Sequence, residues 1–147
     1  MRAPRIISSL LLAVLFALGL ASRSNAADGG YKVIVHPDNP ITSVDREFLR
    51  DAYLRKASEW NRGETLRPID LATKFSVRDQ FTQDVLKKTP SQLKNYWNQQ
   101  IFSGKGVPPP EAESPAAVIA YVLAHPGAVG YVPASIDPGG AKVVSVR

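Results

Sequence analysis

The sequence predicts an α/β domain in which helices flank a mixed β-sheet. Segments rich in β-branched apolar residues lie near both ends of the chain, at 31–36 and 128–146, and the region between them repeats apolar residues at helical spacing. Strands separated by helices need crossover connections, which place the helices on the faces of the sheet. With 44% hydrophobic and 21% charged residues, the chain has the composition of a globular domain.

The first 26 residues have the pattern of a secretory signal peptide. Arg2 and Arg5 precede an apolar run over 6–20, and Ser24-Asn25-Ala26 supplies small residues before a cleavage position. The run is shorter than the ~20 residues that span a bilayer, so we expect cleavage after Ala26 rather than a membrane anchor. The sequence therefore predicts a signal peptide over 1–26 and one exported domain over 27–147, with no membrane span after cleavage.

Charge and cysteine content exclude several classes of function. The chain has 18 basic and 13 acidic residues, but Arg2, Arg5 and Arg23 belong to the predicted signal peptide, which leaves 15 basic residues against 13 acidic ones. This near balance and the lack of a basic nucleic-acid motif argue against nucleic-acid binding. The absence of cysteine excludes disulfides, thiol catalysis and cysteine-based metal sites.

The first half of the domain is expected to form two strands around a helix. Tyr31–His36 is predicted as a central buried strand, because it is β-branched and ends at Pro37. Thr42 and Ser43 offer N-cap hydroxyls for a helix of about three turns ending near Tyr53. Leu66–Leu71 alternates well enough to form a second strand, although it contains a proline.

The second half is expected to contain three helices followed by two strands. A helix is predicted over 76–88, and Thr89-Pro90-Ser91-Gln92 has the capping-box pattern that opens another helix reaching Ile101. Residues 102–110, which include Pro108-Pro109-Pro110, are expected to form a loop. The last three elements are a helix that begins after Ser114, a strand over 128–132 and a strand over 141–146.

Several short motifs occur in the order in which one transport family carries them. They are Leu49–Lys56 followed by Trp60-Asn61-Arg62-Gly63, the strand and turn Val33–Pro40, the segment Arg78–Phe81 and the strand Pro126–Val132. In these motifs the chain resembles the periplasmic phosphate-binding proteins of ABC importers. The resemblance implies a single lobe of a type II periplasmic-binding-protein-like fold, located in a bacterial periplasm. It also implies binding of inorganic phosphate or a similar oxyanion, delivery to an ABC permease, and no enzymatic activity.

Two departures from that family favour an alternative. Where phosphate-binding members carry Ser-Gly-Thr, this chain has Phe75-Ser76-Val77, and the family's proteins are about twice as long and close two lobes over the ligand. The alternative is a structural or interaction domain of the envelope that kept the fold and lost the ligand. Such a domain would use a groove beside Pro108-Pro109-Pro110 to bind an envelope protein or to self-associate, and a homodimer would reconcile the two hypotheses.

The candidate ligand-binding residues lie at two predicted helix starts. Lys74, Ser76 and Arg78 place cations and a hydroxyl at a helix N-terminus, where the dipole and the unpaired N–H groups favour an anion. The alternative is that Ser76, or Thr73 before it, only caps the helix. Thr42 and Ser43 are expected at a second helix N-terminus facing the same crevice, although capping alone would also explain them.

No arrangement of residues indicates catalysis, a metal site or a cofactor. His36 and His125 are isolated from other ligand-type residues, and Glu111 and Glu113 lie in a proline-rich loop with nothing to show that either is buried. We therefore expect a binding or interaction protein and not an enzyme.

Overall fold

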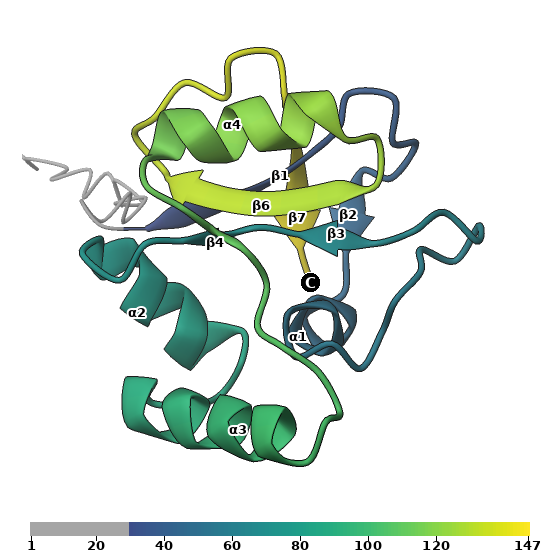
Figure 1. Ribbon diagram of the computed structural model, residues 1–147. Coiled ribbons are helices and arrows are strands. Elements are labelled where there is room, and N and C mark those ends of the chain that lie inside the picture. Colours follow the sequence, from purple (N-terminus) through teal and green to yellow (C-terminus); the bar gives the residue numbers. More distant parts are fainter. Residues whose placement is uncertain (1–29) are drawn as a thin grey trace, which may run out of the picture.

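The computed structural model describes residues 30–147, so the predicted signal peptide lies outside the described residues (Figure 1). The elements in chain order are β1 (Tyr31–Val35), β2 (Ser43–Val44), α1 (Arg46–Tyr53), β3 (Arg67–Pro68), β4 (Asp70–Leu71), α2 (Ser76–Asp84), α3 (Pro90–Phe102), β5 (Glu111–Ala112), α4 (Pro115–Ala124), β6 (Ala128–Pro133) and β7 (Lys142–Val146). None of the helices in this part of the chain is long and apolar enough to cross a membrane.

The main sheet is mixed, as the sequence predicts. Its five strands lie in the order β2-β7-β1-β6-β3, with β1 in the centre. β1 pairs antiparallel with both β6 and β7, whereas the edge strands β2 and β3 pair parallel with their neighbours. The prediction of a central first strand is confirmed, and a second sheet consists only of the parallel pair β4 and β5.

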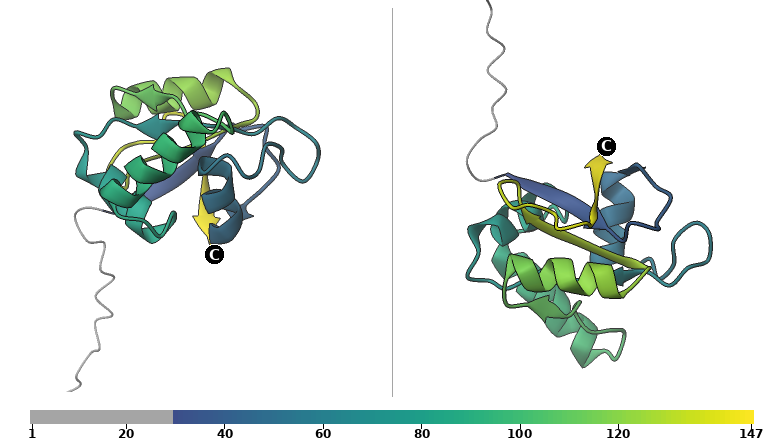
Figure 2. Two further views of the ribbon diagram at one scale, coloured as in Figure 1. Left: turned by 60° about the horizontal axis from the view of Figure 1, so that its bottom comes forward. Right: turned by 90° about the horizontal axis from the view of Figure 1, so that it is seen from above.

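The helices cover the two faces of this sheet unequally. α4 packs along β6 on one face, while α1, α2 and α3 lie on the other side (Figure 1). α3 packs against α2 and is the helix farthest from the sheet (Figures 1 and 2). Gly130 on β6 allows α4 to come this close, because a Cβ there would lie 2.7 Å from the Val118 side chain and 2.9 Å from that of Ile69.

An aromatic cluster fills the space between the sheet and α2. The Phe81 and Tyr131 rings are stacked with their centroids 3.9 Å apart, and Tyr53 contacts Phe81 edge-on at 4.8 Å. All three side chains are buried. This packing fixes the position of α2 relative to β6, and α2 carries the predicted site residue Arg78.

The predicted helix starts are correct where the signal is local. The Thr89 hydroxyl accepts a hydrogen bond from the Gln92 N–H, and the Gln92 side chain accepts one from the Thr89 N–H, so the capping box opens α3 as predicted. Likewise, the Ser114 hydroxyl caps α4 by accepting from the Ala117 N–H.

The prediction for α1 is wrong at its start and in its length. The Thr42 carbonyl accepts a hydrogen bond from the Ser145 N–H, and the Val44 carbonyl accepts one from the Arg147 N–H. Pairing with β7 therefore makes Ser43 and Val44 an edge strand. The N-cap of α1 is Asp45, so the helix has eight residues, about two turns.

Two further elements differ from the predictions. The strand predicted over 66–71 divides into β3, which pairs with β6, and β4, which pairs with β5. Pro68, the last residue of β3, has no N–H to donate to a ladder. The helix predicted over 76–88 ends at Asp84, and Lys87 has a left-handed φ of 56° that no α-helix accommodates.

Candidate functional site

The start of α2 carries the first group of predicted ligand-binding residues. Ser76 is the first residue of the helix and is exposed, and Phe75, whose side chain cannot accept a hydrogen bond, is the N-cap residue. The interpretation that Ser76 or Thr73 is the N-cap residue is therefore wrong. Lys74 is 62% exposed, and its Nζ lies 3.5 Å from a carboxylate oxygen of Glu113.

Arg78 points away from the solvent and into a cluster of acceptors. Its guanidinium donates to the Leu71 carbonyl at 2.8 Å and to Glu111 at 2.7 Å, and a third nitrogen–oxygen distance, to Asp70, is 3.2 Å. The side chains of Arg78 and Asp70 are only 12% and 10% exposed. Tyr131 completes this cluster by donating its phenol proton to Asp70.

Burial determines the electrostatics of the cluster. Loss of solvent raises the pKa of Asp70, although the Arg78 charge and the Tyr131 hydrogen bond act in the opposite direction. Burial also raises the pKa of Tyr131, and the neighbouring Asp70 carboxylate adds to this rise, so the phenol remains a donor. For Arg78, burial lowers the pKa, but the Asp70 and Glu111 carboxylates outweigh burial and raise it.

The balance of charge around the α2 start does not favour an added anion. Arg78 is matched by two carboxylates, Asp70 and Glu111, and Lys74 is matched by Glu113. Three carboxylates therefore face two cations. An oxyanion approaching Arg78 would have to displace Glu111 and would lie beside the buried Asp70.

A groove borders this cluster between α2, α3 and the chain that leads into β5. We call it the α2–α3 groove; its volume is about 550 Å³. The apolar lining includes Trp97 and Ile101 of α3 and Pro108, and the charged lining includes Arg78 of α2, Lys94 of α3 and Glu111 of β5. This volume lies within the usual range for ligand sites, ~300–1,000 Å³.

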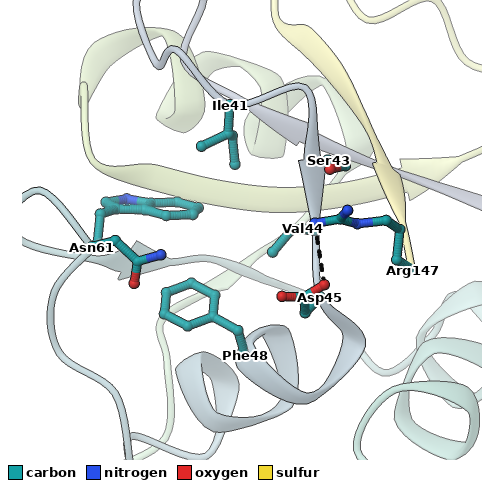
Figure 3. Close-up of a pocket in the computed structure, with 8 residues that line it drawn as sticks. Ile41, Ser43, Val44, Asp45, Phe48, Asn61 and Arg147 are labelled. Atoms are coloured by element: carbon teal, nitrogen blue, oxygen red, sulfur yellow. Dashed lines mark ion pairs between the residues drawn. The ribbon is translucent and has the colours of Figure 1, made fainter.

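The second group of predicted residues lies elsewhere. Ser43 lines a pocket of about 260 Å³ between β2, α1 and the turn that follows α1 (Figure 3). Phe48 and Ile41 point into this pocket, and Asp45 and Arg147 form an ion pair of 3.4 Å at its edge (Figure 3). Both charged side chains are about two-thirds exposed.

The structure does not bring the two groups of residues into one crevice. The pocket beside Ser43 and the α2–α3 groove share no lining residue. Arg46 in the first turn of α1 pairs with Asp84 at the end of α2, so the start of α1 lies beside the end of α2 and not beside its start. Thr42 is exposed, and its carbonyl is used in the pairing with β7.

Sequence reasoning missed the acidic partners of Arg78. Asp70 stands in an otherwise apolar segment, Ile69-Asp70-Leu71-Ala72, and a buried carboxylate there requires a cation or several donors. That local signal could have suggested a structural partner for Arg78. Within residues 30–147 there is no group of three His, Asp or Glu side chains placed to hold a metal ion.

Comparison with known proteins identifies the fold. No protein-family model and no curated protein matches the chain. Among solved structures, an ABC-type phosphate transport receptor from Vibrio cholerae superposes with a TM-score of 0.63 at 18% identity, over 80% of this chain and 46% of the receptor. The corresponding values for PstS from Borrelia burgdorferi are 0.56, 17%, 80% and 47%. This chain has the fold of one lobe of a phosphate-binding protein.

The similarity in fold extends to a structure that holds phosphate. A Clostridium perfringens structure with bound phosphate, assigned to the phosphate ABC transporter substrate-binding proteins, matches with a TM-score of 0.62 at 18% identity. It is covered over 44% of its length, so the chain spans about half the length of the solved structures it matches. The predicted fold class is confirmed, and these neighbours are transport proteins and not enzymes.

Proposed function

We propose that this chain is an exported interaction module of the cell envelope, which keeps one lobe of the phosphate-binding-protein fold and binds a protein partner through the α2–α3 groove. One observation carries the proposal. Arg78, the cation with the most hydrogen-bond donors at the start of α2, is 12% exposed and is paired with Asp70 and Glu111. An oxyanion site built on the Arg78 guanidinium would need free donors there, and these donors are already used within the fold.

The lining of the groove supports a protein as its occupant. Aromatic and aliphatic side chains with a few charged groups at one end are typical of surfaces that bind other proteins. Residues 30–147 form one lobe, whereas a two-lobed protein uses a second surface to exclude water from a small ligand. A partner chain could supply that second surface.

A second candidate function is binding of phosphate or a similar oxyanion for an ABC permease. It is favoured by the exposed Ser76 and the largely exposed Lys74 at the N-terminus of α2, together with the fold of the neighbours. Such an open site would be weak and sensitive to salt, because its charges remain in contact with solvent.

Calorimetric titration separates the two functions. Phosphate and sulfate are titrated at low salt into the purified exported protein and into its Lys74→Ala and Lys56→Ala variants. Lys56 is an exposed lysine after α1 and is the matched control. The interaction module predicts no saturable heat up to millimolar phosphate. Saturable binding that Lys74→Ala abolishes and Lys56→Ala preserves would reject it in favour of the oxyanion site.

A further inference from the structure

Exposed apolar side chains gather at the end of α3 and in the loop after it. Phe102 is 95% exposed, Val107 is 61% exposed and Ile101 is 54% exposed. These are three of the five large hydrophobic side chains that are exposed in the described part of the chain. Exposed apolar patches mark interaction surfaces more often than solvated ones, and Ile101 and Phe102 are adjacent in the chain.

This patch adjoins the α2–α3 groove. Ile101 lines the groove, and Phe102 follows it in the chain but is too exposed to fill the groove of its own molecule. The apolar part of the groove is formed by Leu93 and Trp97 together with Ile101 and Pro108. An apolar projection and an apolar recess are therefore neighbours at the end of α3.

An exposed carboxylate of the groove can pair with the cation of the projection. The charged lining residues are Arg78, Lys94, Asp79 and Glu111; Arg78 and Glu111 pair with each other, whereas Asp79 is exposed. The projecting segment Phe102-Ser103-Gly104-Lys105 carries one cation and no carboxylate. Lys105 lies three residues after Phe102, so the chain between these two residues can span at most ~10 Å.

We propose that the occupant of the α2–α3 groove is a second copy of this chain, with Phe102 of each copy in the groove of the other. Lys105 then faces the acidic end of that groove, where Asp79 is exposed. Because projection and recess are neighbours on α3, a two-fold axis beside α3 makes both contacts at once, as an isologous dimer requires. The inference rests on the proposed function and names its partner.

The first test is the oligomeric state measured by sedimentation equilibrium over a range of concentrations. The wild-type protein is expected to dimerise, and Phe102→Ser is expected to weaken dimerisation at least tenfold. Val143→Ser is the matched control, because Val143 is 46% exposed but lies on β7, and it should leave the dimer unchanged. A dimer that survives Phe102→Ser would overturn the proposed contact.

A charge exchange tests the pairing itself. Lys105→Asp and Asp79→Lys should each weaken the dimer, and the double variant should recover most of the loss, because each copy then carries the reversed pair. Additive losses in the double variant would show that Lys105 does not meet Asp79 across the interface. Circular dichroism of each variant establishes that it is folded.

The outcomes distinguish this inference from the function on which it rests. A wild-type protein that remains monomeric at millimolar concentration overturns the second copy as partner, and if phosphate also gives no heat, the interaction function itself stands. Saturable phosphate binding through Lys74 by a protein that remains monomeric would instead overturn both the interaction function and this inference.

Discussion

A cluster of one aspartate, one arginine and one tyrosine lies at each end of α2. The pKa of the aspartate is raised in one cluster and lowered in the other. At the start of the helix, Asp70, Arg78 and Tyr131 are packed between α2 and the sheet, with the carboxylate 10% exposed. Burial raises the pKa of this carboxyl despite the Arg78 charge and the hydrogen bonds from Tyr131 and the Leu71 N–H. This cluster holds β4, α2 and β6 together in the interior.

The cluster at the end of the helix lies at the surface. Asp84 accepts hydrogen bonds from Tyr31 and Arg46, and its side chain is 47% exposed. Partial burial still acts to raise the pKa of Asp84, but the two hydrogen bonds outweigh it and lower the pKa. The two clusters contain the same three residue types, but the pKa of the aspartate rises in the buried cluster and falls in the exposed one, because the exposed cluster remains in contact with water.

The difference bears on function. A buried arginine that is paired with a buried carboxylate cannot be released for a ligand without leaving a charge unpaired in the interior. Arg78 is in this position, and Arg46 is not. By residue type alone, both arginines could donate hydrogen bonds to an anion. Burial shows that Arg78, and not Arg46, is committed to the fold.

The largest effect is expected from breaking the buried cluster. Arg78→Met should lower the free energy of unfolding by about 3–5 kcal/mol at pH 7, because it leaves Asp70 buried without its cation. The loss should shrink at acidic pH. Arg78 lowers the pKa of Asp70, so without it the carboxyl binds a proton more readily and the uncharged form needs no cation.

Urea unfolding at pH 7 and at pH 4.5 measures both parts of this prediction. Arg62→Met, in an exposed turn, is the matched control and should change stability by less than about 0.5 kcal/mol. If the two variants lost the same small amount of stability, Arg78 would not be a structural residue, and it would return as a ligand candidate.

The contrast between the clusters also shows what the sequence could and could not predict. β1, α3 and α4 were predictable because their signals are local: a β-branched run, a capping box between Thr89 and Gln92, and a serine before a proline. The start of α1 was not, because β7, about a hundred residues later, turns Ser43 and Val44 into a strand. A strand pairing of that range leaves no mark in the local pattern.

The partners of the candidate site residues were hard to predict for the same reason. Lys74, Ser76 and Arg78 lie around a helix start, as the sequence predicts, but the packing that holds Arg78 also involves distant segments. Glu111 is 33 residues away, and the Asp70 that Arg78 contacts is also bound by Tyr131. Whether an arginine at a helix start is free or neutralised depends on tertiary packing, which the sequence pattern does not contain.

A smaller effect is expected at the exposed cluster. Asp84→Asn should cost roughly 0–1 kcal/mol at pH 7, since the pair it breaks is about half exposed and screened by water. Folding lowers the pKa of Asp84, so its stabilisation is present above the unfolded pKa of ~3.9 and is lost as the pH falls toward the folded value.

Thermal unfolding between pH 2.5 and pH 7 checks the sign. The Asp84→Asn protein should lose less stability on acidification than the wild type, whereas Glu59→Gln, at an exposed position away from the cluster, should follow the wild-type curve. Parallel curves for Asp84→Asn and the wild type would show that the exposed carboxylate is not stabilised by Tyr31 and Arg46.

The smallest effect at neutral pH is expected for Tyr31→Phe, which removes one of the two hydrogen bonds to Asp84. Its consequence should appear at alkaline pH. Burial, with the Asp84 hydrogen bond and charge, raises the pKa of Tyr31 to about 12. The unfolded chain releases this proton near pH ~10 and the folded protein does not, so the wild type loses stability between these values. Buried Tyr53 and Tyr131 add to that loss, so Tyr31→Phe should reduce its slope without abolishing it.

Denaturant unfolding at pH 8 and pH 11 measures the difference, with Tyr121→Phe on α4 as the control. Equal slopes in the two variants would mean that Tyr31 is not held as a donor at the surface cluster.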